Sequence, residues 1–163
     1  MARIEWDKQD SVRLKVTDRC AWNCRWCHNE GTGARRPSIS GDVYWDEDTQ
    51  LTLAQLSQVL PIHEVHLTGG EPTLHPDLPR LITGIRYAGF RVKATSVGCN
   101  KLLLQSVISS GLDAINFSVH AIDPLLLART QSNRTVDWCA RQLAQVLECI
   151  SLAAMLGTEV KVN

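Results

Sequence analysis

The chain has 163 residues, of which 44% are apolar and 21% charged, and its formal net charge is zero. This composition is ordinary for a globular protein with one core, so we expect a single domain over residues 1–163. The balanced charge argues against nucleic acid as a partner, and no apolar run approaches the roughly 20 residues that a membrane span needs. Six cysteines without a secretory signal at the N-terminus predict a cytoplasmic location, with thiols used for metal and not for disulfides.

The first half of the chain alternates predicted strands with loops and a helix. Apolar and polar residues alternate at 12–17, which predicts a strand directly before three closely spaced cysteines. Residues 28–50 are rich in Gly, Asn, Asp, Ser and Thr and predict a long loop, which at this length is usually functional or mobile. A short helix at 52–61 and a strand at 63–68 follow, and this strand runs into the sequence Gly-Gly-Glu-Pro at 69–72.

The second half continues the alternation. We predict helices at 77–88, from 102 until Gly111, and at 135–156, and strands at 90–95, 113–119 and 159–163. Strands that alternate with helices of this length indicate parallel βαβ units. The fold class is therefore α/β.

Three cysteines in a C-x3-C-x2-C array dominate the chemistry of the sequence. Cys20, Cys24 and Cys27 offer soft thiolates, which favour iron–sulfur clusters, zinc or copper(I). Three thiolates can hold three irons of a [4Fe–4S] cube and leave the fourth iron open. Zinc would ask for a fourth ligand, which His28 is badly placed to supply, and the sequence has no second pair of cysteines at usual spacing. The third interpretation is that these cysteines are incidental buried side chains, as we expect for Cys139 and Cys149.

Every unusual stretch follows a predicted strand. In parallel α/β sheets, ligands gather at the carboxyl ends of the strands. The stretches are the cysteine array, residues 69–72, residues 95–100, Ser118 to His120, and Lys161 to Asn163. The glycine pair allows close approach of backbone to a ligand, and Glu71 could pair with an ammonium group. A tight turn with a solvated Glu71 is the simpler interpretation of that motif.

Two of these motifs resemble signatures of the radical S-adenosylmethionine (radical SAM) superfamily. The cysteines match its C-x3-C-x-aromatic-C motif, with Trp26 in the aromatic position, and residues 69–72 match its GGEP motif. Within the superfamily the chain is most similar to the GTP 3′,8-cyclases of molybdenum cofactor biosynthesis, in segments at 13–20, 66–72, 111–118 and 160–163. The resemblance implies a partial (β/α) TIM-type barrel of about five parallel strands with intervening helices.

The resemblance also implies cofactors and residue roles. A [4Fe–4S] cluster on Cys20, Cys24 and Cys27 would cleave S-adenosylmethionine and generate a 5′-deoxyadenosyl radical that abstracts hydrogen from a small-molecule substrate. Flavodoxin or ferredoxin would be the electron donor. The implied cofactor-binding residues are Trp26, Gly69, Gly70, Glu71 and Ser118, and the implied substrate-binding residues are Arg13, Thr95 and Lys161. The simpler interpretations are solvated charges for Arg13 and Lys161 and a turn cap for Ser118.

The chain departs from the cyclases in two motifs and in length. His66 stands where the cyclases carry an arginine, and Thr95-Ser96-Val97-Gly98 stands where they carry Thr-Asn-Gly. A full barrel takes about 250 residues, so we expect an incomplete core whose last strand is an open edge. The interpretations are a cyclase-like enzyme acting on a nucleotide, a nucleoside-, natural-product- or peptide-modifying enzyme, a non-enzymatic metal module, and an inactive remnant.

Overall fold

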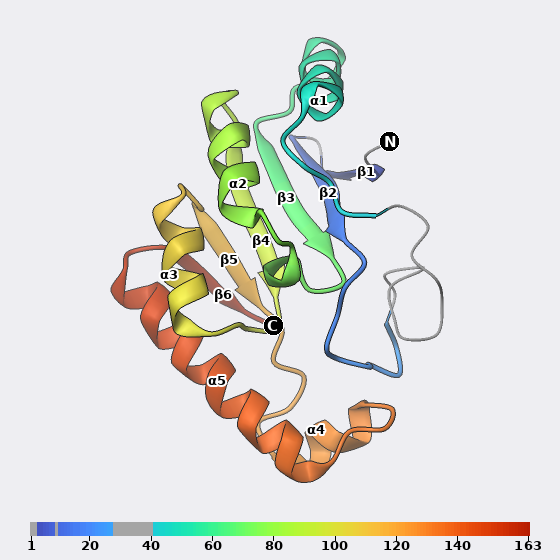
Figure 1. The fold of residues 1–163 in the computed structure, drawn as a ribbon, viewed down its shortest axis with the longest axis vertical. Coiled ribbons are helices and arrows are strands. Elements are labelled where there is room, and N and C mark those ends of the chain that lie inside the picture. Colours follow the sequence, from blue (N-terminus) through green and yellow to red (C-terminus); the bar gives the residue numbers. More distant parts are fainter. Residues whose placement is uncertain (1–2, 9, 28–40) are drawn as a thin grey trace.

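A computed structural model describes residues 3–8, 10–27 and 41–163, and in these the chain forms one six-stranded sheet in the order β1 to β6 (Figure 1). The strands are β1 (Arg3–Lys8), β2 (Ser11–Thr17), β3 (Glu64–Gly69), β4 (Arg91–Ser96), β5 (Ala114–Phe117) and β6 (Glu159–Val162). β2 to β6 are parallel, and β1 is antiparallel to β2. The predicted α/β class with five parallel strands is confirmed, and the sheet is not closed.

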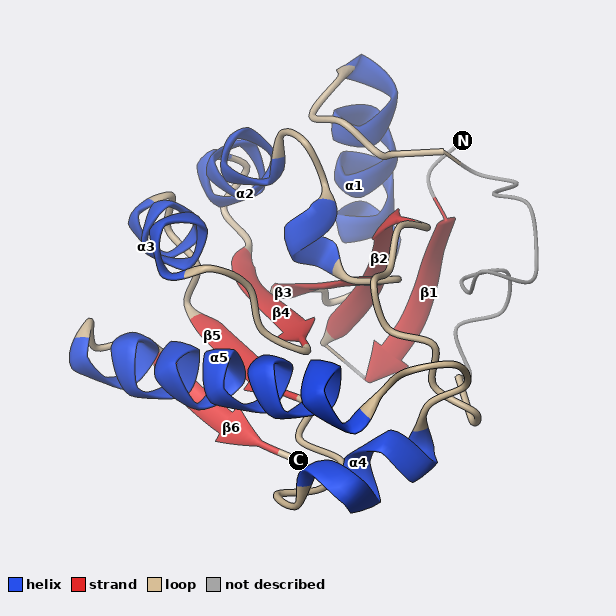
Figure 2. Cartoon of the chain, turned by 60° about the horizontal axis from the view of Figure 1, so that its bottom comes forward, coloured by secondary structure: helices blue, strands red, loops and turns tan. Residues whose placement is uncertain are grey.

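Helices connect the parallel strands. They are α1 (Glu47–Val59), η1 (Pro72–Leu74), α2 (Leu78–Tyr87), α3 (Lys101–Ser109), α4 (Pro124–Thr130) and α5 (Val136–Met155). Figure 2 shows α1, α2, α3 and α5 along one face of the curved sheet. Within the described ranges, none of these helices has the length and apolar character needed to cross a bilayer.

The alternating pattern of the strands separates two environments. In β2, Val12, Leu14 and Val16 are buried in the main core together with residues of the covering helices. Arg13 and Lys15, which alternate with them, are only partly buried. Because successive side chains of a strand point to opposite faces, the apolar face of the sheet packs against the helices and the polar face is left for a cavity.

Two elements of the structure were not predicted from the sequence, and one predicted loop has different bounds. β1 was not predicted, and neither was α4, a seven-residue helix whose N-cap Asp123 accepts a hydrogen bond from the N–H of Leu126 at 2.8 Å. The loop predicted at 28–50 ends early, because α1 begins at Glu47 where the Asp46 side chain caps the N–H of Thr49 at 2.9 Å. Most of that predicted loop, residues 28–40, lies outside the described residues.

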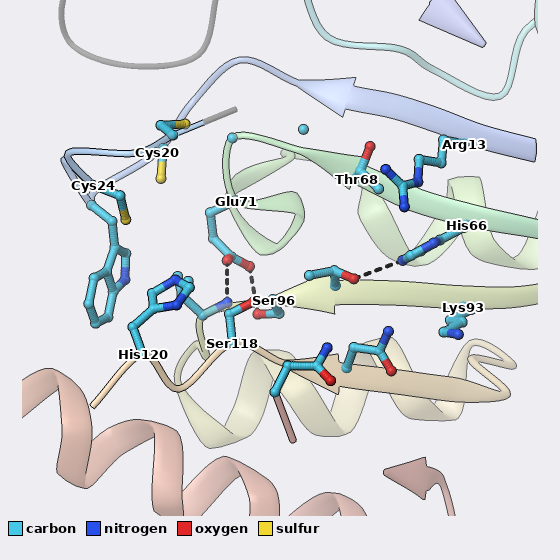
Figure 3. A pocket seen from close by; sticks show the side chains of 18 of the residues that line it. Arg13, Cys20, Cys24, His66, Thr68, Glu71, Lys93, Ser96, Ser118 and His120 are labelled. Carbon is cyan, nitrogen blue, oxygen red and sulfur yellow. Dashed lines mark hydrogen bonds between the residues drawn. The ribbon is translucent and has the colours of Figure 1, made fainter. Parts of the chain in front are cut away.

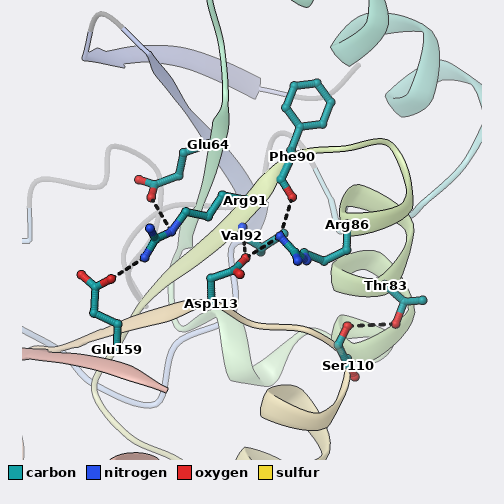
Figure 4. Close-up of polar contacts among 9 residues, drawn as sticks. All are labelled: Glu64, Thr83, Arg86, Phe90, Arg91, Val92, Ser110, Asp113 and Glu159. Carbon is teal, nitrogen blue, oxygen red and sulfur yellow. Dashed lines mark hydrogen bonds and ion pairs between the residues drawn. The ribbon is translucent and has the colours of Figure 1, made fainter. Parts of the chain in front are cut away.

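Ion pairs tie the strands together at their amino-terminal ends (Figure 4). Arg91 at the start of β4 pairs with Glu64 at the start of β3, at 3.5 Å, and with Glu159 at the start of β6. Asp113, just before β5, accepts a hydrogen bond from Arg86 of α2 at 3.0 Å. These pairs lie at the edge of the sheet opposite to the carboxyl ends.

Candidate functional site

The carboxyl ends of the parallel strands surround a cavity of about 490 Å³ (Figure 3). All of the site residues named from the sequence line this cavity, namely Arg13, Cys20, Cys24, Trp26, Cys27, Gly69, Gly70, Glu71, Thr95, Ser118 and Lys161. Cys20, Cys24 and Glu71 lie toward one end of the cavity, and Arg13, His66 and Lys93 lie toward the other. The structure therefore brings the predicted residues together in one place.

The glycine pair after β3 packs against the backbone that leads into the cysteine loop. The N–H of Gly70 donates to the carbonyl of Thr17 at 2.8 Å, and the N–H of Glu71 donates to the carbonyl of Arg19 at 2.7 Å. A Cβ on Gly70 would lie 2.2 Å from the Arg19 oxygen, and a Cβ on Gly69, whose φ is +143°, would lie 2.4 Å from the Thr17 oxygen. Both positions need glycine because two backbones meet there, and this contact fixes Glu71 beside the cysteines.

Glu71 is buried, with 3% of its surface exposed, so the interpretation of a solvated side chain is wrong. Its Oε1 accepts from the N–H of Thr73 (3.1 Å), from the Thr73 hydroxyl (2.7 Å) and from the Ser96 hydroxyl (2.7 Å). Its Oε2 accepts from the N–H of Val97 at 2.7 Å. Burial raises the pKa of the Glu71 carboxyl, and these hydrogen bonds oppose the rise. A carboxylate has about four acceptor sites, so Oε2 retains capacity for one more donor from the cavity.

The cysteine loop provides a donor set that suits a cluster. Cys20 and Cys24 are partly buried and Cys27 is exposed. Burial raises the pKa of the Cys20 thiol to about 11, and the negative charges of Glu71, Cys24 and Cys27 act in the same direction. A bound metal cation would displace the proton and offset this accumulation of negative charge.

The arrangement of these thiols bears on the choice between zinc and a cluster. Among the residues that the structure describes, no three His, Cys, Asp or Glu side chains are grouped to hold one metal ion. A structural zinc site needs its sulfurs at about 2.3 Å from a single centre. In a cluster each thiolate binds a different iron, so the thiols need not converge on one point. The three thiols and the cavity beside them would fit a cluster whose fourth iron is open.

The connection between α4 and α5 holds the cysteine loop from the other side. Cys24 and Gln131 form an isolated antiparallel bridge. On either side of this bridge, the N–H of Ser132 donates to the carbonyl of Asn23 at 2.7 Å, and the N–H of Arg25 donates to the last carbonyl of α4 at 3.0 Å. This contact was missed from the sequence, because α4 was not predicted and nothing local links residues more than a hundred positions apart.

A small second core supports the loop. It consists of Trp22, Leu127, Cys139 and Leu143, all buried, and the rings of Trp22 and Trp138 meet edge to face with centroids 5.1 Å apart. The expectation that Cys139 is a buried packing residue is confirmed. Cys20 and Cys24 pack against this core, so apolar packing beneath the loop stabilises the position of both cysteines.

The aromatic residue of the cysteine motif lies at the mouth of the cavity. Trp26 is 50% exposed, and its ring meets His120 edge to face with centroids 5.5 Å apart. His120 follows β5 and also lines the cavity. This pair therefore faces the cysteine end of the site and is available to a planar ligand.

The opposite end of the cavity carries positive charge. The register of the parallel strands sets Arg13, His66 and Lys93 side by side on β2, β3 and β4. The next layer along the strands carries Thr95 and Lys161, and His66 Nε2 lies 2.8 Å from the Thr95 hydroxyl. Sequence reasoning missed Lys93, whose position becomes informative only once the register is known.

Two lysines carry the part of this positive charge that no described carboxylate neutralises. Glu71 supplies the only side-chain carboxylate among the described lining residues, and it lies at the cysteine end. In the described part of the chain, Lys93 and Lys161 form no ion pair. Unpaired cations in a concave site attract anionic ligands.

The sequence matches a known family over nearly its whole length. The model of the radical SAM superfamily matches residues 14–163. A probable GTP 3′,8-cyclase of Sulfolobus acidocaldarius is 32% identical over 152 residues, which cover 91% of this chain and 44% of that protein. A probable GTP 3′,8-cyclase of Saccharolobus islandicus is 36% identical over 118 residues, which cover 69% of this chain and 35% of that protein. The chain thus spans less than half the length of these relatives.

Solved structures share the fold at low sequence identity. Streptococcus suis SuiB matches with a TM-score of 0.71 and 15% identity, over 95% of this chain and 32% of that one. The SuiB structure bound to S-adenosylmethionine matches with a TM-score of 0.67 and 15% identity, over 96% and 32%. Methylornithine synthase (PylB) matches with a TM-score of 0.68 and 14% identity, over 98% and 44%. These likenesses concern the fold alone.

Proposed function

The chain belongs to the radical SAM superfamily, and on that premise we propose that it is an enzyme, or the cofactor-binding part of one, that cleaves S-adenosylmethionine. Enzymes of this superfamily use a [4Fe–4S] cluster and S-adenosylmethionine. The observation that carries the proposal is the convergence of the cysteine loop, the glycine turn and the ends of β4, β5 and β6 on one cavity. We propose that residues 1–163 form one radical SAM core domain.

Cys20, Cys24 and Cys27 would hold three irons of the cluster and leave one iron open toward the cavity. When bound, the cluster supplies the electron for reductive cleavage of the sulfonium C–S bond of S-adenosylmethionine. The Trp22 core beneath the loop would keep Cys20 and Cys24 in place and limit the access of water from that side. A flavodoxin or ferredoxin is the proposed electron donor, and the cytoplasm, where thiols stay reduced, is the proposed location.

Glu71 would orient the methionyl part of the cofactor. Its Oε2, which accepts one hydrogen bond from the protein, has capacity for a bond from the methionyl ammonium group. Such a charge-assisted hydrogen bond is stronger in a buried site than in water. Gly69 and Gly70 would approach the same group with their backbone, Ser118 would contact the methionyl or ribose part, and Trp26 would lie near the adenine.

The positive end of the cavity supports an anionic small molecule as substrate. Arg13, Lys93 and Lys161 would bind phosphate or carboxylate groups, with Thr95 as a hydrogen-bonding partner. The relatives named as probable GTP 3′,8-cyclases support a nucleotide or nucleoside-like substrate. His66 stands where the cyclases carry an arginine, so we propose that Lys93, its neighbour in register, supplies the positive charge in this chain.

The test is release of 5′-deoxyadenosine by the full chain after anaerobic reconstitution with iron and sulfide, in the presence of S-adenosylmethionine and dithionite. We expect release by the wild type and by Cys139→Ala, which removes a buried thiol outside the array, and no release by Cys24→Ala. Glu71→Ala should keep the brown colour but weaken binding of S-adenosylmethionine, whereas Glu148→Ala, on an exposed surface, should not. A colourless protein with one zinc would instead favour a metal module, and a brown protein without release would favour an inactive remnant.

A further inference from the structure

Gln131 is a buried polar residue at the cysteine loop that the cofactor-binding set does not include. It lies in the connection between α4 and α5, only 1% of its surface is exposed, and its Nε2 lies 3.4 Å from Cys24 Sγ, 107 residues earlier in the chain. We infer that Gln131 is a positioning residue that donates an N–H to the Cys24 thiolate and thereby makes the cluster easier to reduce. This inference rests on the proposed function, because it concerns the cluster that the function requires.

The hydrogen bonds around Gln131 fix which end of its amide faces the sulfur. The N–H of Asn23 can only donate, and it points at one end of the amide at 3.0 Å, so that end is the oxygen Oε1. At the other end, Thr130 Oγ1 lies 2.9 Å away. The Thr130 hydroxyl already donates its single hydrogen to the carbonyl of Leu127 at 2.6 Å, so it must accept from Gln131. The NH2 group therefore has one hydrogen for Thr130 and one for Cys24.

A donor at a ligand sulfur acts on the electron that the cluster receives. Reduction adds negative charge to the cluster and its thiolates, and an N–H aimed at a sulfur stabilises the more negative state more than the less negative one. Hydrogen bonds to the sulfurs are among the features that set the potentials of iron–sulfur clusters. Because only 1% of the Gln131 surface is exposed, bulk water does not compete with Cys24 for this N–H.

Two contacts of the connection between α4 and α5 can be tested separately by substitution. One is its backbone hydrogen bonding to the cysteine loop, and the other is the N–H that the Gln131 side chain donates to Cys24. The backbone hydrogen bond from Ser132 to Asn23 does not involve the Gln131 side chain. Gln131→Glu keeps an oxygen for the N–H of Asn23 but removes the N–H toward Cys24. Gln131→Leu removes both. Asn23→Ala is the matched control, since the Asn23 side chain donates to the carbonyl of Ser132 at 2.8 Å and is not bonded to the sulfur in the described structure.

The experiment is an EPR-monitored redox titration of the reconstituted full chain and these variants, with iron content measured on the same samples. We expect Gln131→Leu to lower the equilibrium constant for one-electron reduction of the cluster about tenfold. This corresponds to a midpoint potential about 59 mV more negative. Gln131→Glu should shift the midpoint at least as far in the same direction, and Asn23→Ala should leave it in place. A fully loaded Gln131→Leu with the wild-type midpoint overturns the inference, and so does an equal shift in Asn23→Ala.

Hydrogen exchange of the apo protein provides a second readout for variants that load poorly. We expect the Asn23 amide to lose protection in Gln131→Leu and to keep it in Gln131→Glu, and unchanged protection in Gln131→Leu overturns the inferred orientation of the amide. A wild type that takes up no cluster defeats the proposed function, while hydrogen exchange still tests the position of Gln131. A wild type that loads and releases 5′-deoxyadenosine, with variants of unchanged midpoint, defeats only this inference.

Discussion

Replacing Gly70 by alanine tests whether the glycine turn holds the site together through contact between two backbones. The added Cβ would lie 2.2 Å from the carbonyl oxygen of Arg19, 2.7 Å from its carbonyl carbon and 2.9 Å from the carbonyl oxygen of Asp18. All three atoms belong to the backbone, so no flexible side chain can move aside. The turn after β3 must therefore move away from the residues that follow β2.

The cost has two parts. Insertion of a methyl group into a well-packed region costs about 1–3 kcal/mol. Separation of the backbones also breaks the hydrogen bonds from Gly70 to Thr17 and from Glu71 to Arg19, and each contributes about 1 kcal/mol. The sum is about 3–5 kcal/mol, a large fraction of the roughly 5–15 kcal/mol that stabilises a typical domain.

Gly89→Ala is the matched control for this change. Gly89 follows α2 with a φ of +92°, and a Cβ there would meet nothing within 4 Å. Its cost is only that of a left-handed backbone, about 1–2 kcal/mol. Urea unfolding of the apo chain, followed by far-ultraviolet circular dichroism, gives both free energies. Equal losses in the two variants, or no loss in Gly70→Ala, would refute the backbone-contact account.

Three further predictions address charge, pH and the remote edge of the sheet. Lys93→Met should weaken binding of an anionic substrate or analogue about tenfold and flatten its salt dependence in calorimetric titrations, whereas Lys101→Met, on an exposed helix end, should change neither. Burial raises the pKa of Glu71 in the folded state, so the free energy of unfolding of the wild type should fall relative to that of Glu71→Gln as the pH rises from 4.5 to 8. Urea unfolding measures both, and a rise in the relative stability of the wild type over that interval would contradict the direction of the pKa shift. Asp113→Asn, which weakens the ion pair with Arg86, should lower the free energy of unfolding by about 1–2 kcal/mol. The yield of 5′-deoxyadenosine per loaded cluster should stay the same, and a lower yield would mean that the amino-terminal edge of the sheet is coupled to the site at the carboxyl edge.

The parts of the fold that the sequence predicted are those with a local signal. Alternation in β2 is visible because Val12 and Leu14 pack on helices while Arg13 faces a cavity. The cysteine array and the glycine turn were recognisable because metal ligation and backbone contact restrict the residue types that these positions accept. α4 has seven residues, too few for a clear helical period, and so it was missed.

The parts that were missed depend on long-range pairing. In the sequence, Lys93 looks like an ordinary residue of a strand. Only the register of β3 and β4 shows that it lies beside His66. Gln131 has no motif of its own, and its role follows from a bridge to Cys24 that only the folded chain creates. Sequence reasoning placed Glu71 in the site, but it missed two of the hydrogen bonds that Glu71 accepts. They come from Ser96 and Val97, whose proximity depends on the packing of β3 against β4.

The central claim is that three thiols at one end of the cavity hold an iron–sulfur cube. Its most direct test is the iron and acid-labile sulfide content of the full chain, reconstituted and purified without oxygen, beside Cys24→Ala. We predict about four irons and four sulfides per wild-type chain and a loss of both in the variant. A wild type that contains neither iron nor sulfide would contradict the claim.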